Sequence, residues 1–383
     1  MSRLEHMRVF SFRVRNLGHW GERYNGGTAN EREGMEMSNQ DQPLVTFLMP
    51  CYNSASFMDR GVQSLLDVVE DVSFPCEIIL VNDGSSDNTS ELTHQYAADH
   101  ESIIAVDQEN ANWGGVVNHG LELARGRYFK VIDSDDYFDA PALRRVLEML
   151  DLSVEADEVP DLLVTNYVYD HLPSNSQRVM KYPKFFPAGR VFEWKDMGKQ
   201  GQDKFIMIHA AWYRTELLRE SGVKLPTGVS YMDSLLLLHP MPYVKTLLYL
   251  NVNPYHYIIG REGQSVEIDV VKKHIDEQIL ATRLAIDDID YAPLYEREPN
   301  CAMLMTGYVS CMMSVSTMHL FMINTPDSLA KNRELWAYLK EKNPTLYANV
   351  KWAWAGWANR RTRIGRLSAM VGYKLARKIY KFA

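Results

Sequence analysis

The sequence predicts an α/β protein with a mostly parallel central sheet, followed by a helical C-terminal region. Between residues 44 and 150, apolar runs of strand length alternate with helix-patterned segments at a spacing of about 25 residues, which is typical of βαβ units. From about residue 270 the hydrophobic spacing is helical throughout. With 383 residues and a hydrophobic content of 46%, the chain is long enough to bury a large core.

The first half of the chain contains four predicted strands, each followed by a helix. The strands are expected at residues 44–49, 77–81, 103–106 and within 127–136. The helices are expected at residues 56–69 and 90–100, in the segment that ends at Gly126, and from Pro141 onward. Glycine is a suitable C-cap, and proline is tolerated in the first turn of a helix. Ser56 and Asp59 form a capping-box pattern at the start of the first helix.

Beyond residue 150 the alternation is less regular. Further strands are expected at residues 162–165, 205–211, 244–250 and 254–259, and short helices at 215–221 and 235–238. Residues 171–200 form a long segment rich in Pro, Lys and Phe, which we expect outside the sheet. The chain thus divides into a disordered extension (1–42), an α/β domain (43–268), a helical region (269–350) and a basic amphipathic tail (351–383).

The charge distribution excludes one class of partner and suggests another. Lys and Arg total 41 against 49 Asp and Glu, a net charge of -8, so we expect no nucleic-acid partner. Residues 360–383 nevertheless hold eight basic residues and no acidic one, which leaves a net charge of -16 on the rest. Apolar residues recur there at helical spacing, a pattern typical of an interfacial helix on an anionic membrane. An ordinary helix with a solvated face is the alternative.

Other segments favour a cytoplasmic protein on the inner face of the cell membrane. The four cysteines lack the spacing of a zinc site and are too few for a disulfide framework, so we expect reduced thiols. The N-terminus lacks the apolar core of a secretory signal. Residues 299–326 are uncharged and long enough to span a membrane, but their Ser, Thr, Asn and His content favours a core or interfacial helix.

Three carboxylates, Asp133, Asp135 and Asp136, directly follow the apolar fourth strand. Burying such a cluster costs free energy unless a cation or ligand offsets the charge, and open α/β sheets bind ligands at the carboxyl ends of their strands. Magnesium typically takes one or two carboxylates while substrate phosphates complete its shell. A helix N-cap is the alternative, but Asp139 could fill that position unaided. We therefore expect a metal site here.

Polar loops follow two neighbouring strands as well. Asp83 and Gly84 end the second strand ahead of several hydroxyl side chains, and an Asp in this place can accept hydrogen bonds from a base N–H or a ribose hydroxyl. A turn with an Asx cap is the alternative. Residues 50–53 follow the first strand in the same way. Two adjacent loops would thus face one ligand.

Residues 48–54, 79–89 and 120–136 together resemble the successive motifs of glycosyltransferase family 2. They read Leu-Met-Pro-Cys-Tyr-Asn-Ser, Ile-Leu-Val-Asn-Asp-Gly-Ser-Ser-Asp-Asn-Thr and Gly-Leu-Glu-Leu-Ala-Arg-Gly-Arg-Tyr-Phe-Lys-Val-Ile-Asp-Ser-Asp-Asp. The resemblance covers residues 44 to about 265. It implies a GT-A fold, an α/β/α sandwich that uses a nucleotide-diphosphate sugar together with Mn²⁺ or Mg²⁺, and we expect the donor to be a UDP-sugar.

The resemblance assigns candidate site residues by position. The donor would be bound by Pro50, Tyr52, Asn53, Asp83, Gly84, Asp133, Ser134 and Arg261. The metal would be held by Asp133, Asp135 and His256. A metal ion on the leaving diphosphate stabilises the negative charge that develops there. For Arg261 the alternative is a solvent-exposed loop, and for His256 it is ordinary packing.

Asp233 lies where this family usually has Glu-Asp at the start of a helix, with the Asp as base for the acceptor hydroxyl. Met232 replaces the Glu, but proton abstraction needs only one positioned carboxylate. An N-cap for the following helix is the alternative. Trp113 could stack on a base or sugar, and His209 lies in a segment that resembles the acceptor-side strand; for both, simple packing is the alternative.

These observations predict a metal-dependent, inverting glycosyltransferase of the hexosyltransferase type. It would move a sugar to a hydroxyl of a glycan or lipid-linked acceptor in cell-surface polysaccharide synthesis. One alternative is a sugar nucleotidyltransferase, which would need a glycine-rich, basic phosphate loop where residues 50–53 stand. The other is a non-catalytic nucleotide-sugar-binding subunit. This alternative stays open because Met232 replaces the Glu that the family usually has.

Overall fold

The computed structural model describes residues 42–198, 205–261, 264, 267–359 and 362–380. The predicted disordered extension lies outside the described residues, apart from residue 42. The strands are β1 Val45–Cys51, β2 Glu77–Asp83, β3 Ile103–Gln108, β4 Tyr128–Val131, β5 Tyr137–Phe138, β6 Leu162–His171, β7 Ser176–Met180, β8 Val191–Glu193, β9 Ala211–Arg214 and β10 Thr246–Ile259. The helices are α2 Met58–Val69, α3 Thr89–Asp99, α4 Asn112–Leu123, α5 Ala140–Glu155, α6 Thr215–Ser221, α7 Asp233–Leu238, α8 Ile268–Lys273, α9 Ile275–Asp287, α10 Tyr291–Arg297, α11 Pro299–Ile323, α12 Pro326–Lys342, α13 Pro344–Val350, α14 Trp354–Ala358 and α15 Arg363–Tyr380.

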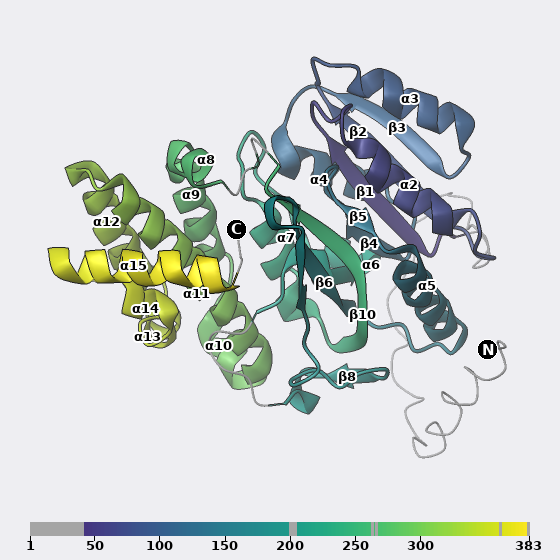
Figure 1. Ribbon diagram of the computed structural model, residues 1–383. Helices are drawn as coiled ribbons and strands as arrows, with labels where there is room; N and C mark the ends of the chain where they lie inside the picture. The colour runs from purple at the N-terminus through teal and green to yellow at the C-terminus, as the bar shows by residue number, and fades with distance from the viewer. Residues whose placement is uncertain (1–41, 199–204, 262–263, 265–266, 360–361, 381–383) are drawn as a thin grey trace, which may run out of the picture. The chain divides into compact units, whose positions relative to one another are not determined.

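The strands form one mixed sheet in the order β3-β2-β1-β4-β9-β6-β10-β5, with β7 paired to β6 and β8 to β10 (Figure 1). The neighbours β3, β2, β1 and β4 run parallel, and so do β6 and β10. Between these two groups, β9 is antiparallel to both β4 and β6. The predicted fold class, a mostly parallel α/β sheet followed by a helical region, is therefore confirmed.

Helices cover both faces of the parallel half of the sheet. Successive side chains of a strand point to opposite faces, and β1 shows this with Leu48 and Met49. A Cβ atom on Gly120 of α4 would lie 2.5 Å from Leu48 Cδ1, and one on Gly61 of α2 would lie 3.1 Å from Met49 Cε. The two helices thus pack on opposite faces, each with a glycine at the contact. Helix α5 packs beside α2.

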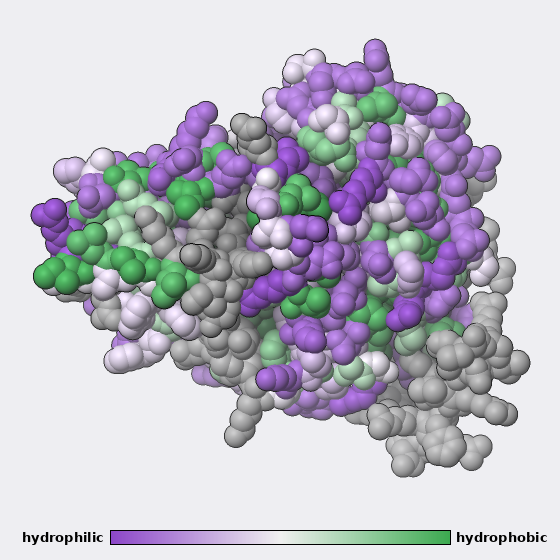
Figure 2. All heavy atoms as spheres, viewed as in Figure 1, coloured by the Kyte–Doolittle hydropathy of each residue, from purple (hydrophilic) through white to green (hydrophobic). Residues whose placement is uncertain are grey.

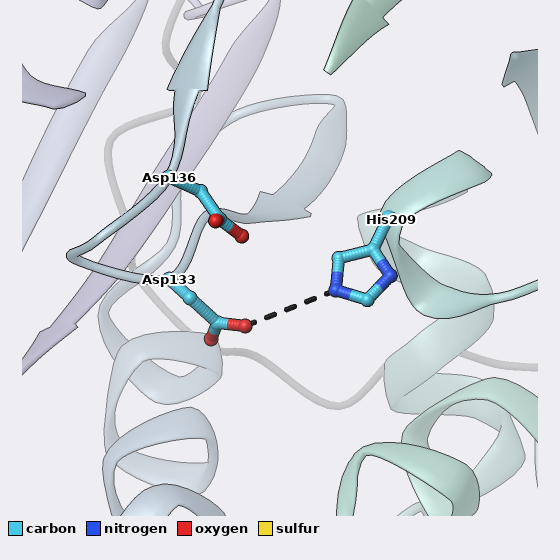
Figure 3. Close-up of side chains that lie close together, drawn as sticks. All are labelled: Asp133, Asp136 and His209. Carbon is cyan, nitrogen blue, oxygen red and sulfur yellow. Dashed lines mark ion pairs between the residues drawn. The ribbon is translucent and has the colours of Figure 1, made fainter. Parts of the chain in front are cut away.

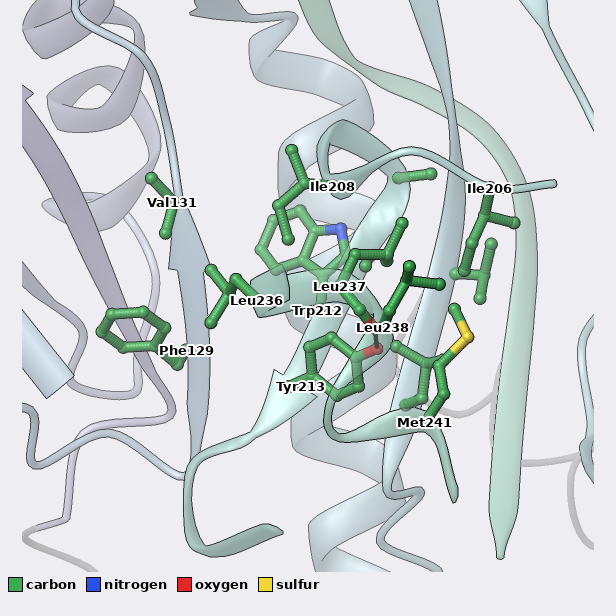
Figure 4. Close-up of a cluster of buried hydrophobic side chains, with 14 of the residues drawn as sticks. Phe129, Val131, Ile206, Ile208, Trp212, Tyr213, Leu236, Leu237, Leu238 and Met241 are labelled. Carbon is green, nitrogen blue, oxygen red and sulfur yellow. Dashed lines mark hydrogen bonds between the residues drawn. The ribbon is translucent and has the colours of Figure 1, made fainter. Parts of the chain in front are cut away.

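A buried apolar cluster joins β4 and β9 to α7 (Figure 4). Trp212 of β9 lies 5.8 Å, centroid to centroid, from Phe47 of β1 in an edge-to-face arrangement, which suits aromatic pairs. Tyr213 donates a hydrogen bond of 2.6 Å to the carbonyl of Leu237 in α7. Residues 235–238 are all buried. This packing fixes α7, and with it Asp233 at its first position.

Several predicted elements differ in the structure. Residues 208–210, predicted as strand, form a 3-10 turn, and β9 begins only at Ala211. The two strands predicted within 244–259 are one strand, β10, with a register shift between Leu250 and Tyr255. Asn166 Nδ2 donates to the side-chain oxygens of both asparagines in that interval, Asn251 at 2.9 Å and Asn253 at 2.8 Å. Tertiary hydrogen bonds therefore support the irregular stretch.

Two further expectations do not hold. The segment 171–200 was expected outside the sheet, but β7 and β8 extend it by pairing with β6 and β10. The capping box of Ser56 and Asp59 is absent, because α2 begins after Phe57 and its N-cap makes no side-chain hydrogen bond. Asp139, by contrast, caps α5 as expected, and its side chain accepts the N–H of Ala142 at 2.9 Å.

The helices from α8 onward belong to the same compact unit as the sheet, residues 39–383. Helix α11 is long and apolar enough to cross a membrane by length and composition, with a mean hydropathy of 1.3 over an 18-residue window. However, 78% of that window is buried inside the protein, so α11 serves here as the core helix of the C-terminal region. The division of the chain into the four predicted parts stays a prediction.

The close contact of α2 with the carboxylate turn can be tested by Gly61→Ala. The added Cβ would lie 2.7 Å from the backbone oxygen of Asp136, which is closer than real contacts allow, so backbone must shift. We expect a loss of about 1–3 kcal/mol in the free energy of unfolding, measured by urea titration. Gly372→Ala in α15 is the control, since its nearest atoms lie 3.7 Å away. Equal stability of both variants would contradict this contact.

Candidate active site

The loops after β1, β2 and β4 are joined by hydrogen bonds. Asn53 adopts a left-handed conformation, φ 48°, and its Oδ1 accepts the N–H of Ser86 at 2.8 Å, while its own N–H donates to Ser85 Oγ at 2.9 Å. The hydroxyls of Ser54 and Ser134 lie 2.9 Å apart. The three motifs separated along the sequence therefore meet at the carboxyl edge of the sheet.

Asp83 is buried and connects β2 to the start of α4. Its Oδ1 accepts the N–H of Ala111 at 2.8 Å and Gln108 Nε2 at 2.7 Å. The local Asx-type turn is made by Asn82, whose Oδ1 accepts the N–H of Ser85 at 3.2 Å. The Asp83 side chain thus makes long-range contacts rather than a local cap. Its role toward a nucleotide stays a prediction.

Three other residues that are predicted to bind the nucleotide-sugar donor lie around this edge. Gly84 has φ 68°, a conformation that favours glycine, and a Cβ there would approach the Asn110 backbone nitrogen to 3.0 Å. Pro50 pairs with Val81 near the end of β1. Tyr52 is 54% exposed, which is unusual for a large aromatic residue and leaves its ring available to a ligand.

Asp136 is the most deeply buried of the three carboxylates. Its Oδ2 accepts the Tyr255 hydroxyl at 2.6 Å, and its Oδ1 accepts the N–H of Ile258 at 2.8 Å. Burial, followed by the charges of Asp135 and Asp133, raises the pKa of Asp136 well above its usual range. Asp136 therefore ties the turn after β4 to β10.

Asp133 is only partly buried and lies between several charged groups. Trp113 Nε1 donates to its Oδ1 at 3.0 Å, so Trp113 contacts a carboxylate in this structure. Burial and the neighbouring charge of Asp135 raise the pKa of Asp133 to about 7, and Asp233 contributes in the same direction. Two neighbouring carboxylates thus add to the effect of burial on this group.

Asp135 forms an ion pair with Arg261. Arg261 donates to Asp135 Oδ2 from Nη2 at 2.8 Å and from Nε at 3.1 Å, and Gln264 Nε2 donates to the same oxygen at 3.0 Å. The guanidinium also lies 4.2 Å above the ring of Phe57. The structure therefore brings together two predicted ligand-binding residues, one expected to bind the metal and the other a phosphate. Both roles stay predictions.

The histidines lie in different places. His209 faces Asp133 and Asp136, and one ligand atom from each of the three residues lies within 4.8 Å of the others (Figure 3). His256 instead stacks on Tyr137, with Nδ1 2.9 Å from the Tyr137 hydroxyl and 3.1 Å from Asp170 Oδ2. The predicted ligand His256 is thus engaged with other side chains, whereas His209, for which packing stood as the alternative, borders the carboxylates.

His209 is suited to offer a lone pair. Burial and the nearby charge of Lys130 lower the pKa of His209 to about 3, so the ring is neutral. Its Nε2 lies 3.9 Å from Asp133 Oδ2, and the ring stacks on Tyr257 with centroids 4.4 Å apart. Two carboxylates and a neutral imidazole form a donor set that Mn²⁺ and Mg²⁺ accept.

The sequence reasoning missed the role of Lys130, a fully buried side chain on β4. Its ammonium donates to the backbone carbonyls of Ile208, His209 and Ala211, at 3.0, 2.7 and 3.1 Å. Three acceptors match the three N–H groups of a charged ammonium. Lys130 thereby holds the 3-10 turn that orients His209. A lysine inside an otherwise apolar strand was the available sequence signal.

Asp233 is the first residue of α7, and Met232 is the N-cap. Burial raises the pKa of Asp233. The Tyr308 hydroxyl of α11 lies 3.4 Å from Asp233 Oδ2, so the C-terminal helical region contributes a side chain to this site. A partly buried carboxylate whose pKa is raised and which is not the N-cap of its helix is suited to accept a proton.

Comparisons with known proteins agree with this geometry. Residues 46–222 match the family model described as glycosyl transferase family 2. A Mycoplasma pneumoniae protein described as an uncharacterized glycosyltransferase is 30% identical over 209 residues, which cover 54% of this chain and 64% of that protein. Bacillus subtilis EpsJ, described in the same words, is 36% identical over 197 residues, covering 50% and 54%. The chain spans less than two thirds of the length of either relative.

A solved structure shows the same fold. S. aureus TarS in complex with UDP-GlcNAc superposes with a TM-score of 0.60 at 16% identity, covering 87% of this chain and 92% of that chain. The match extends beyond the family segment into the helical region. The GT-A-like fold implied by the sequence motifs is therefore confirmed.

The shifted pKa of Asp133 predicts a pH-dependent effect of Asp133→Asn. The folded protein keeps this proton up to about pH 7, whereas the unfolded chain releases it near pH 4, so the stability of the parent protein falls as the pH rises between these values. In metal-free buffer at about pH 8, the variant should be more stable, on the order of 1–2 kcal/mol after allowance for solvent screening.

At about pH 3 the advantage of Asp133→Asn should largely disappear, because the parent carboxyl is then mostly protonated in both states. Urea unfolding followed by circular dichroism measures both values. The control is Asp99→Asn, at an exposed residue of α3, which should show no pH-dependent difference. An equal effect of Asp133→Asn at both pH values would contradict the assignment.

Proposed function

Because residues 46–222 form a glycosyltransferase family 2 domain, we propose that this protein transfers a sugar from a nucleotide-diphosphate donor to a hydroxyl group of a glycan or lipid-linked acceptor. The observation that carries the proposal is the meeting of three polar loops with Asp133 and Asp233. The loops offer hydroxyls, amides and carboxylates to a donor, and Asp233 offers a base. The chain is also 38% identical over 109 residues to a Rhizobium meliloti protein described as a succinoglycan biosynthesis protein, which supports a role in polysaccharide synthesis.

For the donor we propose a UDP-sugar. The structural relative TarS was solved with UDP-GlcNAc, and its fold matches most of this chain. The nucleotide would lie against Tyr52, Asn53 and Asp83, beside the Ser54–Ser134 contact. A bound Mn²⁺ or Mg²⁺ would neutralise charge on the leaving diphosphate. Asp133, Asp136 and His209 offer ligand atoms within 4.8 Å of one another, and Asp135 would join them once Arg261 is engaged elsewhere.

The transfer we propose is a single displacement with inversion at the anomeric carbon. Asp233 takes the proton of the acceptor hydroxyl as its oxygen forms a bond to the anomeric carbon. The bond from that carbon to the diphosphate oxygen breaks, and the diphosphate leaves with the electron pair. Asp233 enters from α7, whereas the diphosphate-facing residues follow β4. A base and a leaving group held by different elements suit displacement from opposite sides.

Arg261 is the residue that we assign to the donor diphosphate. Its guanidinium is paired with Asp135 at 2.8 Å. Guanidinium groups bind phosphate and carboxylate through the same fork of N–H donors. We propose that Arg261 donates these hydrogen bonds to the diphosphate when the donor is bound, which would leave Asp135 able to hold a metal ion.

Asp135→Ala tests the metal site. We expect transfer to fall by at least about a hundredfold, and Mn²⁺-dependent binding of UDP-GlcNAc to be lost, because a carboxylate ligand is removed. Isothermal titration with and without Mn²⁺ measures binding, and release of UDP measures turnover. Asp99→Ala, at an exposed position of α3, is the control and should behave as the parent. Turnover near the parent level in Asp135→Ala would refute the assignment.

Asp233→Asn tests whether Asp233 is the catalytic base or a structural residue. The amide keeps the shape of the side chain but cannot accept the proton, so transfer should fall by about a hundredfold or more while donor binding is unchanged. The matched control is Asp269→Asn, since Asp269 also lies in the first turn of a short helix, α8, and is exposed. Loss of both donor binding and transfer in Asp233→Asn would mean that Asp233 supports the fold instead.

A further inference from the structure

Exposed hydrophobic side chains are concentrated near the C-terminus. Among the described residues, seven of the thirteen large hydrophobic side chains that are exposed lie between residues 352 and 375. They are Trp352, Trp354, Trp357, Ile364, Leu367, Val371 and Leu375. Single exposed hydrophobic residues need no explanation, but a group of this size marks an interaction surface.

Helix α15 turns its aliphatic face away from the protein. Ile364, Leu367, Val371 and Leu375 follow one another at intervals of three or four residues, so they share one face of the helix, and they are 82%, 51%, 65% and 55% exposed. The helix packs on Met318 and Phe321 of α11 through other residues, Ala369, Met370 and Tyr373. A surface helix of a globular protein normally buries its apolar stripe.

Trp357 borders this face, and two more exposed tryptophans lie near it in the sequence. Trp357 lies beside α15, since a Cβ atom on Gly372 would be 3.7 Å from the indole ring, and it remains 53% exposed. Trp352 and Trp354 are 79% and 61% exposed. The Lys351 ammonium lies 5.5 Å from the centre of the Trp352 ring. Figure 2 shows hydrophobic residues gathered over α15.

The charge around this face selects its partner. From residue 360 to 383 the chain has eight basic residues and no acidic one, whereas the rest carries a net charge of -16. Aliphatic side chains flanked by cations and joined by tryptophans are the combination that binds at the interface of an anionic bilayer: the apolar face enters the acyl boundary, indoles lie at the headgroup level, and cations attract the lipid phosphates.

We propose that Trp352, Trp354, Trp357 and the outward face of α15 form one docking surface for an anionic phospholipid bilayer, here termed the α15 surface. It joins two segments of the chain, and the structure places them together. The proposal does not depend on the transferase activity, because binding is measured without donor or acceptor. It would hold the protein at the inner leaflet, where a lipid-linked acceptor is available.

Vesicle cosedimentation of the full chain tests this proposal. The protein should bind vesicles of phosphatidylcholine with phosphatidylglycerol, bind pure phosphatidylcholine vesicles much more weakly, and be released by high salt. The double variant Leu367→Glu with Val371→Glu should bind at least about tenfold more weakly, because charge replaces inserted aliphatic area. Both side chains are solvent-exposed, so the fold should persist, which circular dichroism checks.

A second variant, Trp352→Ala with Trp354→Ala, should also weaken binding, which a surface restricted to α15 would not predict. The matched control is Leu280→Glu, a leucine of α9 that is 40% exposed, and it should bind as the parent. Parent-level binding in the Leu367/Val371 variant would overturn the proposal. It would also be overturned if these substitutions instead abolished a concentration-dependent dimer, since the surface would then be an interface between two copies.

Discussion

The site depends on the burial of two hydrogen-bonded polar side chains, Lys130 in β4 and Asp136 in the turn that follows it. Lys130 and Asp136 are both 1% exposed, and each is satisfied by the backbone of a different segment. The ammonium holds the carbonyls of the turn at 208–211, and the carboxylate holds Ile258 and the Tyr255 hydroxyl. Removal of either side chain leaves buried hydrogen-bonding groups unsatisfied, which typically costs about 1–3 kcal/mol for each group. Lys130 therefore holds the turn before β9 next to β4, and Asp136 holds strand β10 next to the turn after β4.

This arrangement leaves an excess of negative charge at the front of the site. Asp133 has its pKa raised to about 7 by burial and by its acidic neighbours, although Lys130 acts in the opposite sense. Asp135 is compensated by Arg261 and Gln264, which come from the segment after β10. A bound cation would supply the missing charge at Asp133, and the neutral ring of His209 is held in place to join it. Structural and ligand-binding demands are thus met by the same few groups.

Helix α11 connects the site with the C-terminal surface. Its Tyr308 contacts Asp233, and roughly three turns further along the helix Met318 and Phe321 pack against α15. The apolar composition of α11 is explained by this position, since most of the helix is covered by other elements. The helical region therefore makes two contributions: it places Tyr308 beside the candidate base, and it supports the helix that presents aliphatic side chains to solvent.

The sequence alone determined the α/β class, the parallel half of the sheet and the edge at which the site forms, because strand and helix periodicity and the loops at 50–53, 83–89 and 133–136 are local patterns. The sequence could not determine which residues from distant parts of the chain lie next to that edge. The turn at 208–210 was predicted as a strand because its form depends on Lys130, and the choice between His209 and His256 depends on which face of the sheet each ring occupies. Those contacts join residues about 80 to 130 positions apart, so only the tertiary structure decides them.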